Sequence, residues 1–141
     1  MILKKRFEPL EHPSDVGITA FGESLKEAFE NAAYGMFAIM SDPDKLKSKL
    51  SFDIKTKASD KEALLINWLN ELIYLEDTNK VLLKEFKIDK ISETELKARV
   101  FGEKIDPKRH LLERPVKAAT FNQLMVKEEK GVWRARVVFD V

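Results

Sequence analysis

Two acidic side chains at opposite ends of the chain have the chemistry of a cation site. Asp15 stands just before an expected strand, and Asp140 precedes Val141, whose α-carboxylate ends the chain. Carboxylates held close together repel unless a positive charge lies between them, and hard cations prefer oxygen ligands. If Asp15 and Asp140 meet, they form an oxygen-rich metal site with the terminal carboxylate. The alternatives are a turn former at Asp15 and a solvated, frayed end at Asp140.

The histidine nearest this candidate site is His12, in the stretch Glu11-His12-Pro13-Ser14-Asp15. Imidazole is a common metal ligand, but a histidine beside proline and serine is also explained as a hydrogen-bonded turn residue. We interpret His12 as a neighbour that orients the site, and not as a ligand.

Two further positions invite either a functional or a purely structural interpretation. Lys117 lies among small and apolar residues, where its ammonium group either reaches solvent or binds an anion. Trp68 lies among leucines at helical spacing, which favours a core position over a partner-binding one.

The composition excludes several kinds of chemistry. Cysteine is absent, which rules out disulfides, thiolate zinc sites and cysteine nucleophiles. The sequence also lacks the phosphate-binding, dinucleotide-binding, zinc-protease and serine-hydrolase motifs. The 25 basic and 24 acidic residues nearly cancel, so only a local patch could attract nucleic acid. An accessory or binding role, without catalysis, is favoured.

Hydrophobic periodicity predicts the elements that must position these residues. Ser24 with Glu27, and Ser59 with Glu62, form two capping boxes that open amphipathic helices over about 25–40 and 63–75. The second helix is apolar over more than one stripe, so we expect it to contact the domain on several sides. Alternation with a period of two predicts about seven strands, in the ranges 3–10, 16–21, 50–55, 86–89, 96–100, 116–126 and 132–141.

These elements predict one α+β domain over residues 1–141, with two amphipathic helices packed on a largely antiparallel β-sheet. No apolar run approaches the roughly 20 residues of a membrane span, and the N-terminus lacks the apolar core of a signal peptide. We therefore expect a cytoplasmic protein with no membrane partner.

Five segments taken together resemble the archease family. In chain order they are His12-Pro13-Ser14-Asp15-Val16-Gly17-Ile18, 25–32, 65–75, Val116-Lys117-Ala118-Ala119-Thr120 and 133–141. Each is a weak signal alone, but the ordered set covers nearly the whole chain. The chain departs from the family pattern at Pro13-Ser14, where Thr-Ala is usual, and at Phe121-Asn122, where Tyr-His is frequent.

The resemblance implies an accessory protein of the GTP-dependent RNA ligase that joins tRNA halves. Such proteins assist guanylylation of the ligase and permit multiple turnover, so the expected partner is the ligase, with tRNA reached indirectly through it. The family's Ca²⁺ site carries over to Asp15, Asp140 and Val141, with Mg²⁺ or Mn²⁺ as alternatives in function. Lys117 matches a family lysine associated with activity.

Two other functions remain as alternatives. A self-standing metal-dependent phosphodiesterase would also use clustered carboxylates, although most two-metal sites need more ligands than this sequence offers. A chaperone-like or nucleic-acid-binding module would need basic residues that cluster in space, because the net charge is only +1.

Overall fold

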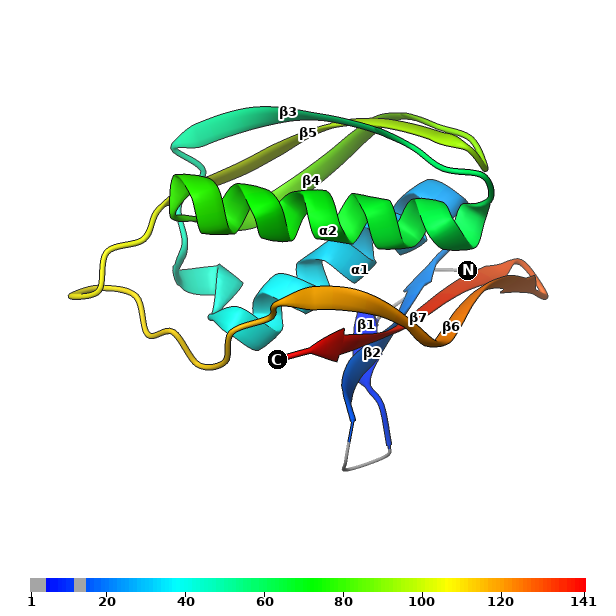
Figure 1. Cartoon of the computed structure of the whole chain (residues 1–141), viewed down its shortest axis with the longest axis horizontal. Helices are drawn as coiled ribbons and strands as arrows, with labels where there is room; N and C mark the ends of the chain where they lie inside the picture. Colours follow the sequence, from blue (N-terminus) through cyan, green and yellow to red (C-terminus); the bar gives the residue numbers. More distant parts are fainter. Residues whose placement is uncertain (1–4, 12–14) are drawn as a thin grey trace.

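The structure, a computed structural model, describes residues 5–11 and 15–141. These residues form two antiparallel sheets and two long helices (Figure 1), which confirms the expected α+β class. The first sheet has the order β1-β2-β7-β6, with β1 (Phe7–Pro9), β2 (Val16–Gly22), β7 (Val132–Asp140) and β6 (Ala118–Glu129). The second has the order β3-β5-β4, with β3 (Leu50–Lys57), β5 (Glu95–Lys104) and β4 (Val81–Ile91). The helices are α1 (Leu25–Met40), the short 3₁₀ helix η1 (Pro43–Lys45) and α2 (Lys61–Asn79).

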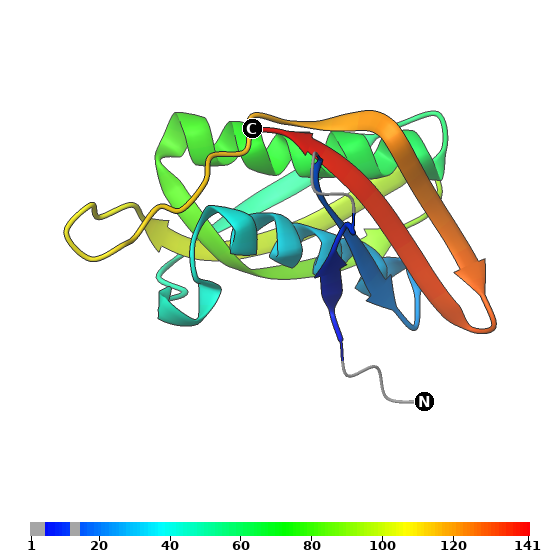
Figure 2. The ribbon, with the colours of Figure 1, turned by 90° about the horizontal axis from the view of Figure 1, so that it is seen from below.

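The two long helices form the middle layer between the sheets. In Figure 1, α1 and α2 lie beneath the β3-β5-β4 sheet, with the other sheet below them; in Figure 2, seen from below, the β3-β5-β4 sheet lies behind the helices. α1 packs on β2 and β4, while α2 packs on β6 and β3. A helix between two sheets must be apolar on opposite sides, which explains the broad apolar surface of α2.

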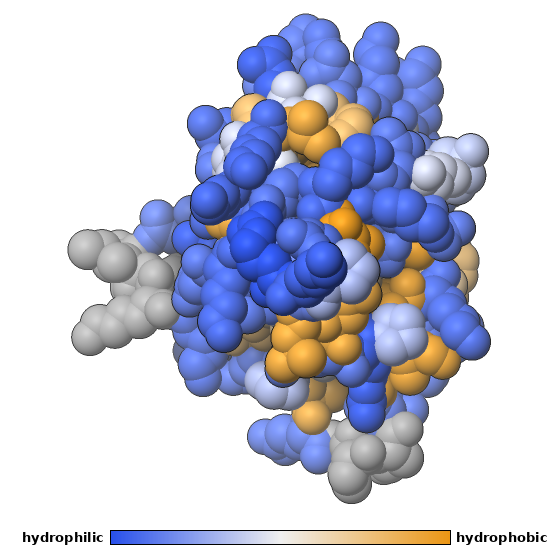
Figure 3. Space-filling view, turned by 90° about the vertical axis from the view of Figure 1, so that its left-hand side faces the viewer, coloured by the Kyte–Doolittle hydropathy of each residue, from blue (hydrophilic) through white to orange (hydrophobic). Residues whose placement is uncertain are grey.

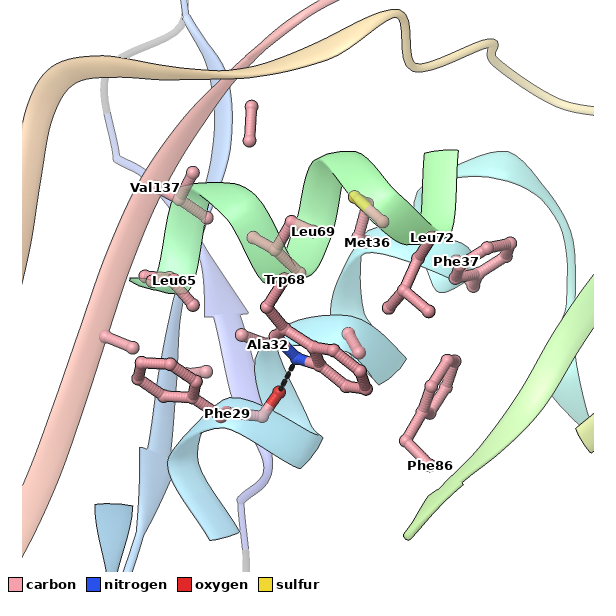
Figure 4. Close-up of a cluster of buried hydrophobic side chains, with 14 of the residues drawn as sticks. Phe29, Ala32, Met36, Phe37, Leu65, Trp68, Leu69, Leu72, Phe86 and Val137 are labelled. Atoms are coloured by element: carbon pink, nitrogen blue, oxygen red, sulfur yellow. Dashed lines mark hydrogen bonds between the residues drawn. The ribbon is translucent and has the colours of Figure 1, made fainter. Parts of the chain in front are cut away.

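Trp68 of α2 belongs to this core, as the sequence predicts. Its side chain is fully buried, and its Nε1–H donates a 2.9 Å hydrogen bond to the carbonyl oxygen of Phe29 in α1 (Figure 4). The ring of Phe86 meets the indole edge to face, with the ring centroids 6.5 Å apart. Trp68 thus joins both helices and β4 and is not available to a partner.

The cap predicted for α1 is confirmed, and the cap predicted for α2 is wrong. Ser24 accepts a hydrogen bond from the N–H of Glu27, and the carboxylate of Glu27 accepts one from the N–H of Glu23. α2 begins instead with Asp60, whose carboxylate accepts a 2.8 Å bond from the N–H of Ala63. Serine and aspartate are equally good N-caps, so spacing alone could not choose between Ser59 and Asp60.

The strands differ from the prediction mainly at their ends. β4 begins at Val81, several residues before the alternating stretch that predicted it. The prediction missed these first residues because they are buried on both faces of the strand. Burial on both faces removes the alternation that the prediction used. β6 begins at Ala118, so Lys117 lies just outside it. Neither long helix in the described part of the chain combines the length and apolarity needed to cross a membrane.

Candidate functional site

The strand register brings the start of β2 and the end of β7 to one end of the first sheet. β2 pairs with β7 up to Val16 opposite Phe139, and β7 pairs with β6 up to Asp140 opposite Ala118. Continuing the β2–β7 register by one residue sets Asp15 opposite Asp140. Residues opposite each other on antiparallel strands point to the same face, with Cβ atoms about 5 Å apart. Figure 2 shows the end of β7 beside the start of β6.

Asp15 is tied to β6 by a residue that the sequence did not single out. Its Oδ2 accepts a 3.1 Å hydrogen bond from Nε2 of Gln123. Gln123 has a φ of 56° and lies where the β6–β7 register shifts between Thr120 and Met125. Its carbonyl oxygen accepts a 2.8 Å bond from Nε of Arg136, which holds this irregular turn of β6. The bulge therefore directs the Gln123 side chain across β7 toward Asp15.

Asp140 and Val141 are exposed but held by the main chain. The carbonyl oxygen of Asp140 accepts a 2.8 Å hydrogen bond from the N–H of Lys117. Val141 follows directly and is 44% exposed. Strand pairing that persists to Asp140 argues against the frayed end considered from the sequence. The same bond brings Lys117, whose side chain is exposed, alongside the acidic end of β7.

The donors at this end of the sheet are chemically suited to a hard cation. Asp15, Asp140 and the carboxylate of Val141 offer only oxygen atoms, which Ca²⁺ and Mg²⁺ prefer. They include just two side chains, and residues 5–11 and 15–141 contain no group of three or more His, Cys, Asp or Glu arranged to hold a metal. Two side chains alone would leave most of the coordination positions of a Ca²⁺ ion to other ligands.

Two sequence features near this site can be compared with the structure only in part. His12 and the unusual Pro13-Ser14 lie outside the described residues, so the orienting role of His12 stays a prediction. Phe121, the other departure from the family pattern, is 67% exposed on β6.

An open pocket of about 500 Å³ lies next to Lys117, between α2 and the start of β6. Asn70 of α2 joins the two elements, because its Oδ1 accepts a 2.9 Å bond from the N–H of Ala119. Tyr74, one turn further along α2, is 66% exposed at the same pocket. A partner that reaches Lys117 would meet this aromatic side chain.

A buried carboxylate anchors the loop that leads to Lys117. Glu103 at the end of β5 is 3% exposed and accepts hydrogen bonds from the Arg109 guanidinium and, at 2.7 Å, from the N–H of Lys47. Burial alone would raise the pKa of Glu103, but these bonds and the neighbouring His110 ring outweigh it and lower the pKa to about 2. Glu103 is therefore ionised at neutral pH and fixes the loop of residues 105–117.

The tautomer of His110 follows from its two contacts. Its Nδ1 accepts a 2.8 Å hydrogen bond from the N–H of Asp106, so the ring proton is on Nε2. Nε2 lies 3.3 Å from Oε2 of Glu103, and both side chains are almost fully buried. His110 thus has a structural role. The sequence does not predict this role, because the contacts of His110 with Asp106 and Glu103 depend on how the loop folds back onto β5.

Comparison with known proteins identifies the family. Residues 7–141 match the model of the Archease protein family (MTH1598/TM1083). A protein archease from Methanosarcina mazei is 38% identical over 141 residues, covering 97% of each chain. A protein archease from Sulfolobus acidocaldarius is 36% identical over 137 residues, covering 96% of this chain and 99% of its own.

Solved structures agree with this assignment. The solution structure of protein 1598 of Methanobacterium thermoautotrophicum has a TM-score of 0.81 and 34% identity, covering 96% of this chain and 99% of its own. The crystal structure of an archease from Thermotoga maritima, described as a possible chaperone, has a TM-score of 0.62 and 18% identity over 95% of this chain and 96% of its own, and it bears on the fold alone. The chain therefore belongs to the archease family.

Proposed function

We propose that this protein is a non-catalytic accessory factor of the cytoplasmic GTP-dependent RNA ligase that joins tRNA halves, promoting guanylylation of the ligase and its multiple turnover. The ligase is the direct partner, and tRNA is reached through it. The family resemblance suggests this role. The observation that carries it on this chain is the β2–β7–β6 register, which gathers Asp15, Asp140 and Val141 at one exposed end of a sheet.

The carboxylates of this exposed end would hold a divalent cation. Asp15, Asp140 and the terminal carboxylate of Val141 supply the oxygen atoms, for Ca²⁺ or, in function, for Mg²⁺ or Mn²⁺. When bound, the cation would supply positive charge for the phosphates of the ligase's nucleotide. Gln123 orients the Asp15 carboxylate through its 3.1 Å hydrogen bond. The chain contributes geometry and charge, and the ligase contributes the reacting groups.

Lys117 would act at the same docking surface. Its backbone N–H fixes the last residues of β7, while its exposed ammonium group remains available to an anion of the ligase or of its nucleotide. The buried Glu103 holds the preceding loop, so Lys117 is presented from a fixed position. His12 is proposed as a neighbour that orients the site.

Ligase guanylylation, measured with and without this protein across divalent metals, tests the proposal. The wild-type chain should stimulate guanylylation, and Asp140→Ala should abolish the stimulation while leaving the domain folded. Glu128→Ala is the matched control, because it removes an exposed carboxylate from the opposite end of the same two strands. Equal stimulation by wild type and Asp140→Ala would refute the role of the acidic end.

Two further measurements, RNA cleavage without the ligase and aggregation of the ligase, separate the alternative functions. A phosphodiesterase would cleave RNA without the ligase, but the described residues offer it few metal ligands. A chaperone is the second candidate, favoured by the description of the Thermotoga maritima neighbour as a possible chaperone. A chaperone would protect the ligase from aggregation equally well with Asp140→Ala, whereas an activator would not retain its effect.

A further inference from the structure

The outer face of the β3-β5-β4 sheet carries a row of three lysines. β3 sets Lys55 opposite Lys97 of β5, and β4 sets Lys90 opposite the same Lys97. All three side chains are exposed. We call Lys55, Lys97 and Lys90 the lysine row. Like charges directly opposite each other on neighbouring strands destabilise a sheet, so the row costs stability in the free protein.

Two acidic side chains near the lysine row pair with other basic residues and not with the row. Glu95 pairs with Lys57 at 3.4 Å, and Asp53 pairs with Arg99 at 3.6 Å. Within the described part of the chain, no carboxylate lies within ion-pair distance of an ammonium group of the lysine row. Asp89, in the bulge of β4, is the remaining acidic side chain close to it.

The lysine row lies in a broad open hollow of about 1060 Å³. Four lysines line this hollow, the row and Lys57, against two acidic residues, Asp89 and Glu95. Both long helices pack against the other face of this sheet, and no described element covers the outer face (Figure 1). Figure 3 faces the other end of this sheet, where β3 begins, and there too the uppermost surface is mainly hydrophilic.

We propose that the lysine row binds the phosphate backbone of RNA. Lysine ammonium groups are compact charges that bind phosphates without a fixed geometry, and an extended phosphate chain can contact several adjacent lysines. The same face presents the ring of Phe101, with Nζ of Lys87 5.4 Å from its centroid. An unpaired base of RNA can stack on an aromatic ring that lies beside basic side chains. An acidic protein has no bases and could not make this contact, which favours RNA as the partner.

The choice of RNA over DNA rests on the proposed function. The contact with phosphates rests only on the pairing of β3, β5 and β4 and on the charges of the lysine row. The protein's net charge of +1 gives no long-range attraction, so binding must come from this local cluster. The two sheets place the lysine row and the acidic end of β7 on different layers of the molecule. One accessory protein could therefore contact RNA and the ligase at separate surfaces.

The test is binding of labelled single-stranded RNA by the whole chain, without ligase, measured by fluorescence anisotropy between about 50 and 200 mM salt. The combined variant Lys55→Gln/Lys90→Gln/Lys97→Gln removes the lysine row. The matched control, Lys26→Gln/Lys108→Gln/Lys130→Gln, removes three exposed lysines from α1, the 105–117 loop and the β6–β7 turn. Both variants change the net charge equally.

Three phosphate contacts contribute about 2 to the slope of log affinity against log salt, and on the order of 100-fold in affinity at about 0.1 M salt. The lysine-row variant should lose this affinity and slope, and the control should keep most of both. Equal losses in the two variants, or wild-type binding that does not depend on salt, would overturn the proposal. So would equal affinity for DNA of the same sequence, or a lysine-row-dependent binding to anionic vesicles that exceeds binding to RNA.

Two further measurements keep the outcome interpretable. The thermal midpoint of the lysine-row variant should equal or exceed that of wild type, because the substitution relieves repulsion, and a lower midpoint would contradict that account. Asp140→Ala should bind RNA as wild type does. If Asp140→Ala stimulates the ligase as wild type does while the lysine-row variant loses RNA binding, the role of the acidic end fails and the lysine row stands. If Asp140→Ala loses stimulation while the lysine-row variant binds RNA as wild type does, the lysine row fails and the role of the acidic end stands.

Discussion

Replacing Glu103 with glutamine should destabilise the protein at neutral pH and make little difference in strong acid. Glu103 is 3% exposed, and its pKa falls from the ordinary 4.5 to about 2 because hydrogen bonds from Arg109 and Lys47, together with the neighbouring His110 ring, outweigh burial. That difference corresponds to roughly 3 kcal/mol of folding free energy carried by the ionised form.

The sign follows from the direction of the shift. A carboxyl group whose folded pKa is lowered stabilises the fold fully above its unfolded pKa, and the stabilisation disappears as the pH falls toward the folded pKa. The contribution of Glu103 should therefore be complete above about pH 4.5 and lost progressively as the pH approaches 2. Glutamine cannot ionise, so Glu103→Gln should lack this pH-dependent part.

Urea unfolding of wild type and Glu103→Gln, from pH 7 down to pH 2, measures the effect directly. The two free energies of unfolding should differ by roughly 3 kcal/mol at pH 7, and the difference should shrink below about pH 4.5 and largely disappear near pH 2. Glu128→Gln, the same substitution at an exposed position of β6, is the control for general loss of a carboxylate. A difference that stays constant with pH, or grows in acid, would refute the idea that an ionised Glu103 anchors the 105–117 loop.

Two other substitutions test local features of the fold. Asp60→Ala should lower the free energy of unfolding by about 1 kcal/mol, because it removes the N-cap of α2, whereas Ser59→Ala should be nearly neutral. A larger loss for Ser59→Ala than for Asp60→Ala would instead support the cap predicted from the sequence. Gly102→Ala should cost about 2 kcal/mol or more by thermal or urea unfolding, because its new Cβ would collide with the carbonyl oxygen of Leu82 on β4, and a wild-type stability would show that β4 and β5 can separate without penalty.

The sequence predicted those parts of the structure that depend on local patterns. The α1 cap at Ser24 and the core position of Trp68 follow from spacing within one helix, and both are confirmed. β7 was the clearest predicted strand because its apolar residues alternate strictly, and it forms over Val132–Asp140. The family resemblance drew on the same ordered segments.

Features that depend on contacts between distant segments could not be predicted in this way. Gln123 reaches Asp15 only because β6 carries a bulge, and no local signal marks that residue. Glu103 continues an alternating strand like any surface residue, and its burial depends on a loop that folds back over it. The lysine row likewise exists only through the register of three strands, although each lysine is visible in the sequence.

In the proposed function, Asp15 and Asp140 form one cation site with the carboxylate of Val141, because the β2–β7 register sets the two aspartates opposite each other. Calorimetric titration of the metal-free protein with Ca²⁺ tests it most directly, using wild type, Asp15→Asn, Asp140→Asn and a chain extended beyond Val141. We predict a single site in the wild type that is lost in both aspartate variants and weakened by the extension. Unchanged Ca²⁺ affinity in either aspartate variant would contradict the account.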